Sequence, residues 1–228
     1  MFDFDSATGE LFLYDDIGPA WLGMIDAGAV MNAMKDWPSE ERMTVRINSP
    51  GGSVDEGIAI YNMLRRHQGG VDVVVDSLAA SIASYIALAG DTVTIAENGM
   101  FMVHAPWMLA AGNATELREA ADTLDKYQMR IESAYKKRMQ LSDEELAALM
   151  AAETWYTAEE AIAAGLADRM DGPTDEVVAV AKGRFKNTPA AYVADATPGS
   201  RTPYNHDRKR YEYQAARYTS KKTVDNII

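Results

Sequence analysis

The chain has 228 residues, 47% of them hydrophobic and 25% charged, a composition that fits a soluble globular protein with one substantial core and excludes disordered and fibrous classes. It contains no cysteine, which excludes disulfides, thiol nucleophiles and cysteine-based zinc sites. Residues 182–228 carry ten Lys and Arg against four Asp and Glu, so the net charge of −12 divides into +6 on this tail and −18 on the first 181 residues. Since an acidic body repels nucleic acid and acidic lipid, neither is an expected partner.

Strands and helices are predicted to alternate along the first 170 residues. In chain order, the expected elements are a strand at 10–14, a helix at 20–37, a strand at 43–48, a helix at 54–67, a strand at 71–75, a short helix at 81–88, strands at 92–95 and 99–103, a long helix at 115–140, and two helices that open at Ser142 and Thr157. The last two begin with capping-box signatures, and Gly165 suits the residue just after a helix. Such alternation predicts an α/β fold with a largely parallel sheet.

The pattern weakens after Asp168, so we predict a domain at 1–180 and a basic extension at 181–228. From Asn187 onward the chain is rich in Pro, Gly, Ser, Thr and charge. We expect it to be extended, partly disordered, or ordered only against another subunit. This tail is either an arm that docks on an acidic partner or nucleic acid, or a solvated or subunit-contacting segment, and the second interpretation is favoured.

No membrane span or secretory leader is expected. Residues 1–5 are acidic where a secretory signal would be basic and then apolar. The most apolar uncharged run, 77–90, is shorter than the roughly 20 residues that a helix needs to cross a bilayer, and it is interrupted by serines.

The sequence holds candidates for the parts of a serine hydrolase, which needs a hydroxyl, a base, a group that orients the base, and amides that bind an oxyanion. Ser81 stands between small residues where a helix begins after a strand; by itself it could simply cap that helix. Of the three histidines, His67 ends a surface helix and His206 lies in the tail, whereas His104 follows an apolar strand and precedes a proline. A residue at a strand exit is well placed to line a cleft, although His104 could also be structural.

The pair Gly51-Gly52 follows another strand and permits backbone conformations that aim an amide at a substrate. Taken alone, the pair could equally be a tight turn before a helix. No cluster of His or carboxylates has the spacing of a metal site, and no cofactor is expected.

Three segments that follow successive strands carry a resemblance. They are Asn48-Ser49-Pro50-Gly51-Gly52-Ser53, Ala79-Ala80-Ser81 and Met102-Val103-His104-Ala105-Pro106. In this order the chain resembles the Clp protease proteolytic subunit, a serine peptidase family with a crotonase-like superhelix of ββα units and a long handle helix. Further matches at 112–117, 156–161 and 165–168 extend the resemblance to about residues 10–170.

The resemblance implies Ser81 as nucleophile, His104 as general base, and the amides of Gly52 and Ile82 as the oxyanion hole. Aligned on Trp155, it puts Glu153 where the family has an Asp as the third triad member. Glu can orient a histidine in serine hydrolases. Asp143 and Asp168 are the fallback candidates for this third role.

A peptide or unfolded protein is the expected substrate, bound as an added strand between two segments. The residues expected to contact it are Gly51, Ser53 and Val54 on one side and Ala105, Trp107 and Met108 on the other.

The resemblance also implies a homo-oligomeric ring, usually of seven subunits and stacked in pairs through the helix at 115–140. An ATP-dependent unfoldase is a possible partner, although the short N-terminus and the segment after His104 depart from the family pattern. Short chains of this kind also occur in phages as head maturation proteases, which would make capsid proteins the partners. Either role implies a cytoplasmic location, in a bacterium or encoded by a phage within one.

Three other interpretations remain open at this stage. A degenerate family member could act as a ring scaffold or head-assembly subunit without cleaving. A crotonase-type acyl-CoA enzyme would leave Ser81 and His104 unexplained as a pair. A Ser-Lys peptidase is disfavoured because no lysine lies between Lys35 and Lys126.

Overall fold

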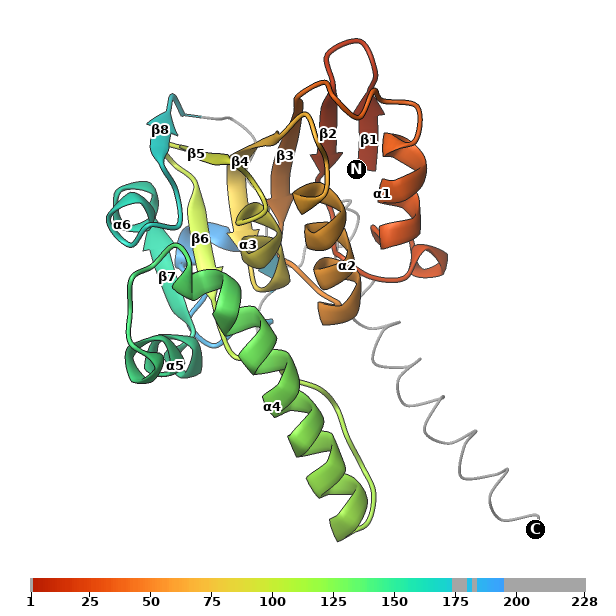
Figure 1. Cartoon of the computed structure of the whole chain (residues 1–228). Coiled ribbons are helices and arrows are strands. Elements are labelled where there is room, and N and C mark those ends of the chain that lie inside the picture. Colours follow the sequence, from red (N-terminus) through yellow and green to blue (C-terminus); the bar gives the residue numbers. More distant parts are fainter. Residues whose placement is uncertain (1, 174–179, 182–183, 195–228) are drawn as a thin grey trace, which may run out of the picture.

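A mixed, mainly parallel sheet forms the frame of the molecule. The computed structural model describes residues 2–173, 180–181 and 184–194 (Figure 1). The strands of the main sheet are β1 (Phe2–Asp5), β2 (Glu10–Leu13), β3 (Met43–Ser49), β4 (Val71–Ala80), β5 (Thr92–Ala96), β6 (Met100–Val103), β7 (Thr154–Thr157) and β8 (Arg169–Asp171). Their order is β1-β2-β3-β4-β5-β8, with β6 paired to β4 and β7 paired to β6. The pairs β1/β2 and β6/β7 are antiparallel and the others are parallel, which confirms the expected α/β class.

Helices cover one face of this sheet, and one of them projects from the body. The helices are α1 (Ala27–Met34), α2 (Val54–Arg65), α3 (Ile82–Ala87), α4 (Ala114–Lys136), α5 (Asp143–Ala152) and α6 (Ala158–Ala163), with short 3-10 turns η1 (Ala20–Leu22) and η2 (Ala190–Tyr192). Figure 1 shows α1, α2 and α3 side by side on the sheet, while α4 extends away from it as a rod. Accordingly, α3 is buried at all six positions, whereas α4 buries only residues near its C-terminal end.

Strand β4 changes partner along its length, and this change shapes the centre of the molecule. Its first half pairs with β5 from Asp72 to Val75, and its last three residues pair with β6. The strand therefore runs to Ala80, five residues beyond the predicted end at Val75. Asp76 is tolerated inside it because Arg46 on the neighbouring strand β3 forms an ion pair and hydrogen bonds with its carboxylate.

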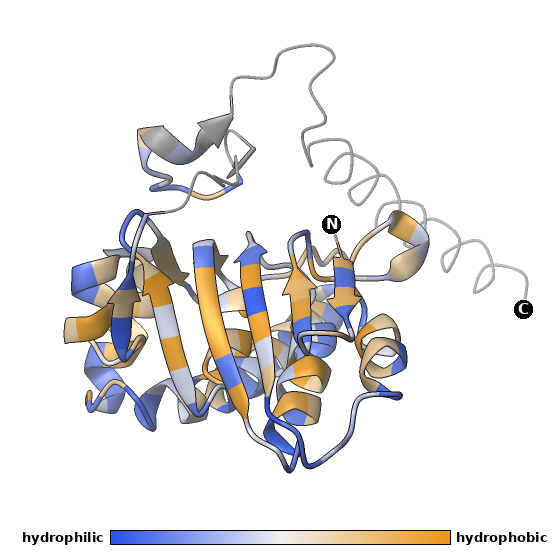
Figure 2. Cartoon of the chain, turned by 90° about the horizontal axis from the view of Figure 1, so that it is seen from above, coloured by the Kyte–Doolittle hydropathy of each residue, from blue (hydrophilic) through white to orange (hydrophobic). Residues whose placement is uncertain are grey.

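Residues 184–194 lie on the face of the main sheet opposite α1, α2 and α3 (Figure 2). There Phe185 and Tyr192 pack with Leu78, Ala80 and Met102 in a second apolar cluster. Alternation along the strands explains the second cluster, because successive side chains of β4 and β6 point to opposite faces. The short strands β9 (Val180–Ala181) and β10 (Val193–Ala194) pair in parallel beside it.

Two expectations from the sequence are wrong in detail. A single helix over 20–37 does not form: η1 ends at Gly23, which takes the left-handed conformation with φ +77°, and α1 starts only after its N-cap Asp26. Residues 187–194 were expected to be extended, disordered or ordered only against another subunit, but they contact the body of their own chain. Residues 195–228, including His206 and most of the basic tail, lie outside the described residues, and the domain boundary at 180 stays a prediction.

Candidate active site

Ser81 stands at the sharp turn from β4 into α3, in a conformation that few residues adopt. Its φ of 57° and ψ of −129° lie outside the allowed regions for L-residues, a strain on the order of 1–3 kcal/mol that the surroundings must offset. Its backbone N–H donates to Met102 O at 2.9 Å, and its carbonyl accepts from Ser84 Oγ at 2.6 Å. A serine on such a strained strand-to-helix turn presents its hydroxyl outward, as nucleophilic serines of hydrolases do.

Strand pairing brings His104 to this serine. Because Ala80 lies opposite Met102 in the parallel β4/β6 pair, the residues just past the two strands emerge side by side. Ser81 Oγ lies 2.7 Å from His104 Nε2, a normal hydrogen-bond distance. Two residues chosen from the sequence for separate reasons therefore form the nucleophile–base contact that acyl transfer requires.

The surroundings of His104 favour its neutral form. Burial lowers the pKa of His104 below its ordinary value of 6.5, and the positive charges of Arg184 and Lys186 act in the same direction. The carboxylate of Glu153 opposes them by raising this pKa, but the net shift is downward. A neutral imidazole at pH 7 can accept a proton from the serine hydroxyl.

Glu153 reaches the neighbourhood of His104 through another strand pair. Val103 pairs with Thr154 in the antiparallel β6/β7 ladder, so the next residues outward on the two strands are His104 and Glu153. Glu153 caps α5 in the left-handed conformation, with φ 55°, and its side chain is buried. Its carboxylate accepts hydrogen bonds from the backbone N–H groups of Lys186 at 2.9 Å and Asn187 at 2.6 Å. Within the described residues it makes no hydrogen bond to His104, so its role as third triad member stays a prediction.

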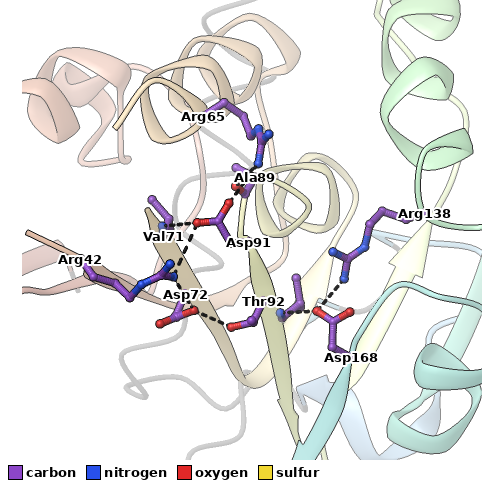
Figure 3. A network of polar contacts seen from close by, with 10 residues as sticks. Arg42, Arg65, Val71, Asp72, Ala89, Asp91, Thr92, Arg138 and Asp168 are labelled. Atoms are coloured by element: carbon purple, nitrogen blue, oxygen red, sulfur yellow. Dashed lines mark hydrogen bonds and ion pairs between the residues drawn. The ribbon is translucent and has the colours of Figure 1, made fainter. Parts of the chain in front are cut away.

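Neither fallback carboxylate lies at the site. Asp168 accepts from the N–H of Val93 and forms an ion pair with Arg138, on the far side of β5 (Figure 3). Asp143 opens α5, is largely exposed and pairs with Lys136 at 2.6 Å. Glu153 is thus the one of the three candidate carboxylates that influences the pKa of His104.

The glycine pair lies directly beside Ser81. Gly51 has φ +86°, and a Cβ there would stand 2.8 Å from Ser81 Cβ and 3.0 Å from the amide nitrogen of Ile82. Gly52 has φ +150°, and a Cβ there would stand 2.0 Å from Ile17 O, so a side chain is excluded at both positions. Within the part of the chain that the structure describes, the amides of Gly52 and Ile82 donate to no protein acceptor, which leaves both open to a ligand oxygen.

The segments expected to bind substrate flank the site, but some of their backbone N–H groups are already hydrogen-bonded within the chain and so cannot bind a peptide. The N–H of Ser53 donates to Ile17 O at 2.8 Å, and Val54 is already the first residue of α2. The N–H of Ala105 donates to Met150 O at 3.0 Å. Trp107 and Met108 are exposed on the irregular stretch between β6 and α4. Their contact with a peptide stays a prediction, and an added strand would have to use other backbone groups.

Sequence reasoning missed the segment 184–187, which lies against the site. Phe185 packs edge-on against the His104 ring with centroids 5.6 Å apart, and likewise against Trp155 at 5.8 Å. The adjacent amides of Lys186 and Asn187 hold the Glu153 carboxylate. A single large aromatic residue among charged ones was the only local signal for this segment, and it does not reveal which surface the aromatic residue covers.

No group of three His, Cys, Asp or Glu residues that could hold a metal ion occurs in the described ranges, and no described helix is long and apolar enough to cross a membrane.

A comparison with protein-family models shows which family the chain belongs to. A family model described as Clp protease matches residues 26–172, a stretch that contains Gly51, Ser81, His104 and Glu153. This match covers more than half of the chain, and the mixed α/β architecture is consistent with it. The chain therefore belongs to the Clp protease family, a family of peptidases.

Proposed function

We propose that this chain is a serine endopeptidase that hydrolyses peptide bonds through Ser81 and His104. The observation that carries the proposal is the 2.7 Å contact between Ser81 Oγ and His104 Nε2 on a strained strand-to-helix turn. The strain supports the proposal because a backbone conformation this costly persists only where the surrounding structure imposes it, most often at functional sites.

Acylation would begin with the attack of Ser81 Oγ on the carbonyl carbon of the scissile bond while His104 Nε2 takes the hydroxyl proton. The carbonyl oxygen becomes an oxyanion, which the amides of Gly52 and Ile82 would bind. When the tetrahedral intermediate collapses, the C–N bond breaks and His104 returns the proton to the leaving amine. An ester between Ser81 and the N-terminal part of the substrate remains.

Deacylation would repeat these steps with water as the nucleophile. His104 takes a proton from the water, the hydroxide adds to the ester carbonyl, and the serine oxygen leaves with the proton that His104 returns. The products are a free carboxylate and the original enzyme, so no cofactor enters the balance.

Glu153 would stabilise the imidazolium that forms in both steps. Its charge already favours the protonated form of His104, which is the electrostatic part of the third triad role. Its two hydrogen bonds from backbone amides hold the carboxylate in place.

Labelling with a fluorophosphonate probe tests this proposal directly. The probe should form a stoichiometric adduct that mass spectrometry locates on Ser81, and both Ser81→Ala and His104→Ala should abolish it. A matched control is His67→Ala, because His67 lies on the surface after α2 and its imidazole Nε2 forms a hydrogen bond with the carbonyl oxygen of Glu41 rather than with a residue of the site. An adduct on another residue, or undiminished labelling of the His104 variant, would refute the mechanism.

We further propose that the peptidase works inside a homo-oligomeric ring, stacked through α4 in the manner of the family's handle helix. The support is that α4, 23 residues long, projects from the body and exposes Leu117 and Met129. An ATP-dependent unfoldase or phage capsid proteins would be the partners of such a ring, and the bacterial cytoplasm its location. Light scattering coupled to size exclusion tests the assembly: Leu117→Asp should reduce the particle mass, and a monomeric wild type would refute the ring.

One observation favours a second candidate, a catalytically degenerate scaffold. The Glu153 carboxylate is engaged by Lys186 and Asn187 rather than by His104, and Phe185 lies on the histidine ring. The same labelling experiment separates the two functions, because a scaffold would give no adduct in either its assembled or its dissociated form.

A further inference from the structure

An arginine from beyond the family-matched region reaches the glycine pair at the active site. Arg184 Nη2 forms an ion pair with Asp16 Oδ1 at 2.6 Å, and it also approaches the carbonyl oxygen of Gly51 at 3.4 Å. The Asp16 side chain is 1% exposed and that of Arg184 is 11% exposed. Removing two charges from water is costly, so a buried ion pair is weak evidence of a purely stabilising role.

The ion pair is continuous with the backbone that holds the glycine loop. Ile17, the residue after Asp16, donates its N–H to Gly51 O at 3.0 Å and accepts from the N–H of Ser53 at 2.8 Å. Gly52 lies opposite Ile17 in a parallel bridge. The carbonyl of Gly51 therefore has two donors aimed at it, one from Ile17 and a longer contact from Arg184.

Holding this carbonyl also orients the amide on its other side. The C=O of Gly51 and the N–H of Gly52 belong to one planar trans peptide, so they point in opposite directions and turn together. Because both residues are glycines with positive φ, no side chain restricts the rotation of this peptide. Its orientation depends on what binds the Gly51 oxygen.

We propose that Arg184, anchored by Asp16, is a positioning residue that keeps the Gly51–Gly52 peptide turned so that the Gly52 N–H faces the oxyanion. This inference rests on the proposed function of the site. The residues that follow Arg184 are also held in place. Phe185 packs on the His104 ring, and the backbone amides of the two residues after it donate to the Glu153 carboxylate. The segment thus completes the site from outside the part of the chain that the family model matches.

The test compares Arg184→Met and Asp16→Asn with Arg138→Met. Arg138 provides a matched control, since it also binds an aspartate, Asp168 at 2.9 Å (Figure 3), and a glycine carbonyl, Gly165 O at 3.2 Å, but this carbonyl does not belong to the glycine pair beside Ser81. The assay is the rate of fluorophosphonate labelling at increasing probe concentration, which separates the maximal rate from the concentration at half-maximal rate. It is run at pH 8.5, two units above the ordinary histidine pKa of 6.5, because the positive charge of Arg184 helps to lower the pKa of His104 and its loss would raise that pKa.

In Arg184→Met the maximal labelling rate should fall by about tenfold, less than the 10²–10³-fold loss typical of a missing oxyanion donor, because Ile17 still holds Gly51. The half-maximal concentration should stay within about twofold, since the ground-state contacts of the probe are unchanged. Arg184→Lys, which keeps the charge, should recover part of the rate. Arg138→Met should leave the labelling rate unchanged, whatever it costs in thermal stability.

The two residues should act as one unit. The Asp16→Asn/Arg184→Met double variant should label no more slowly than Arg184→Met alone, because residues in one network are not additive. If Arg184→Met does not fold, Asp16→Asn and Arg184→Lys carry the same comparison.

Three outcomes would overturn the inference, and they differ in what else they overturn. A wild type that is not labelled on Ser81 refutes the proposed function and this inference with it. A labelled wild type with an unchanged rate in Arg184→Met refutes only the positioning role. Faster labelling of Arg184→Met would mean that the segment covers the site and inhibits it, which is the opposite effect.

Discussion

Replacing Glu153 with glutamine should lower both the stability of the protein and the rate at which Ser81 is labelled. The glutamate and glutamine side chains differ by one charge and have nearly the same volume. In the wild type the carboxylate accepts from two backbone N–H groups, those of Lys186 and Asn187. A glutamine can accept only one of these bonds with its oxygen, and it turns an NH₂ donor toward the other N–H.

The size of the effect follows from this lost bond. A hydrogen bond to a charged group contributes about 1.5–3 kcal/mol to stability. Because Lys186 and Asn187 are exposed, water can replace part of the lost acceptor, and the lower end applies. We expect a loss of about 1.5 kcal/mol in the free energy of unfolding, which corresponds to a fall in Tm of roughly 3–6 °C for a chain of this size.

Thermal unfolding and fluorophosphonate labelling measure the two consequences. Glu119→Gln on the exposed surface of α4 is the matched control for a lost charge, and it should change stability by less than about 0.5 kcal/mol. Since Glu153 makes no hydrogen bond to His104 in the described residues, the labelling rate should fall by about 10- to 100-fold, well short of the ~10⁴-fold loss seen when a bonded triad carboxylate becomes an amide.

Two results would refute this reasoning. An unchanged Tm would mean that the carboxylate does not hold the segment after residue 184. A labelling loss as complete as that of Ser81→Ala would mean that Glu153 bonds directly to His104 in the active protein.

Three further predictions follow from the same geometry. Gly51→Ala should lose more than about 2 kcal/mol of stability and all labelling, because φ is +86° and the new Cβ would stand 2.5 Å from a backbone oxygen and 2.8 Å from Ser81 Cβ; a wild-type Tm would contradict this. Since burial lowers the pKa of His104, the labelling rate should fall on acidification only below pH 6.5, and a midpoint above 6.5 would refute the assignment. Tyr135→Phe removes a 2.7 Å contact with Ser84 Oγ and should cost about 1 kcal/mol in chemical denaturation without changing the labelling rate; a loss of labelling would show that this buried pair controls the turn at Ser81.

The parts of the fold that short-range chemistry controls were predictable from sequence. Ser142 with Glu145, and Thr157 with Glu160, form the capping boxes that their spacing predicted. Gly165 takes a positive φ just after α6, as its position implied. Each of these features involves groups within four residues of one another, so the local sequence determines them.

Features that depend on pairing between distant segments were predicted poorly. Strand β7 was missed because four residues carry too little pattern of their own, and its strand form comes from the antiparallel ladder with β6. The last half of β4 was missed because Asp76 and Ser77 resemble loop residues; Arg46, from another strand, is what permits Asp76 to be buried there.

The sequence by itself determined which residues could carry the chemistry: one serine at a strand-to-helix turn, one histidine at a strand exit and a glycine pair. Only the tertiary structure decided that they meet. Ser81 and His104 are brought to 2.7 Å by the switch of β4 from β5 to β6, a choice of strand partner that no local pattern encodes. The tertiary structure alone also placed Arg184 against Gly51, which lies 133 residues earlier in the chain. Contacts at that separation depend on how the whole chain packs rather than on the propensity of any segment.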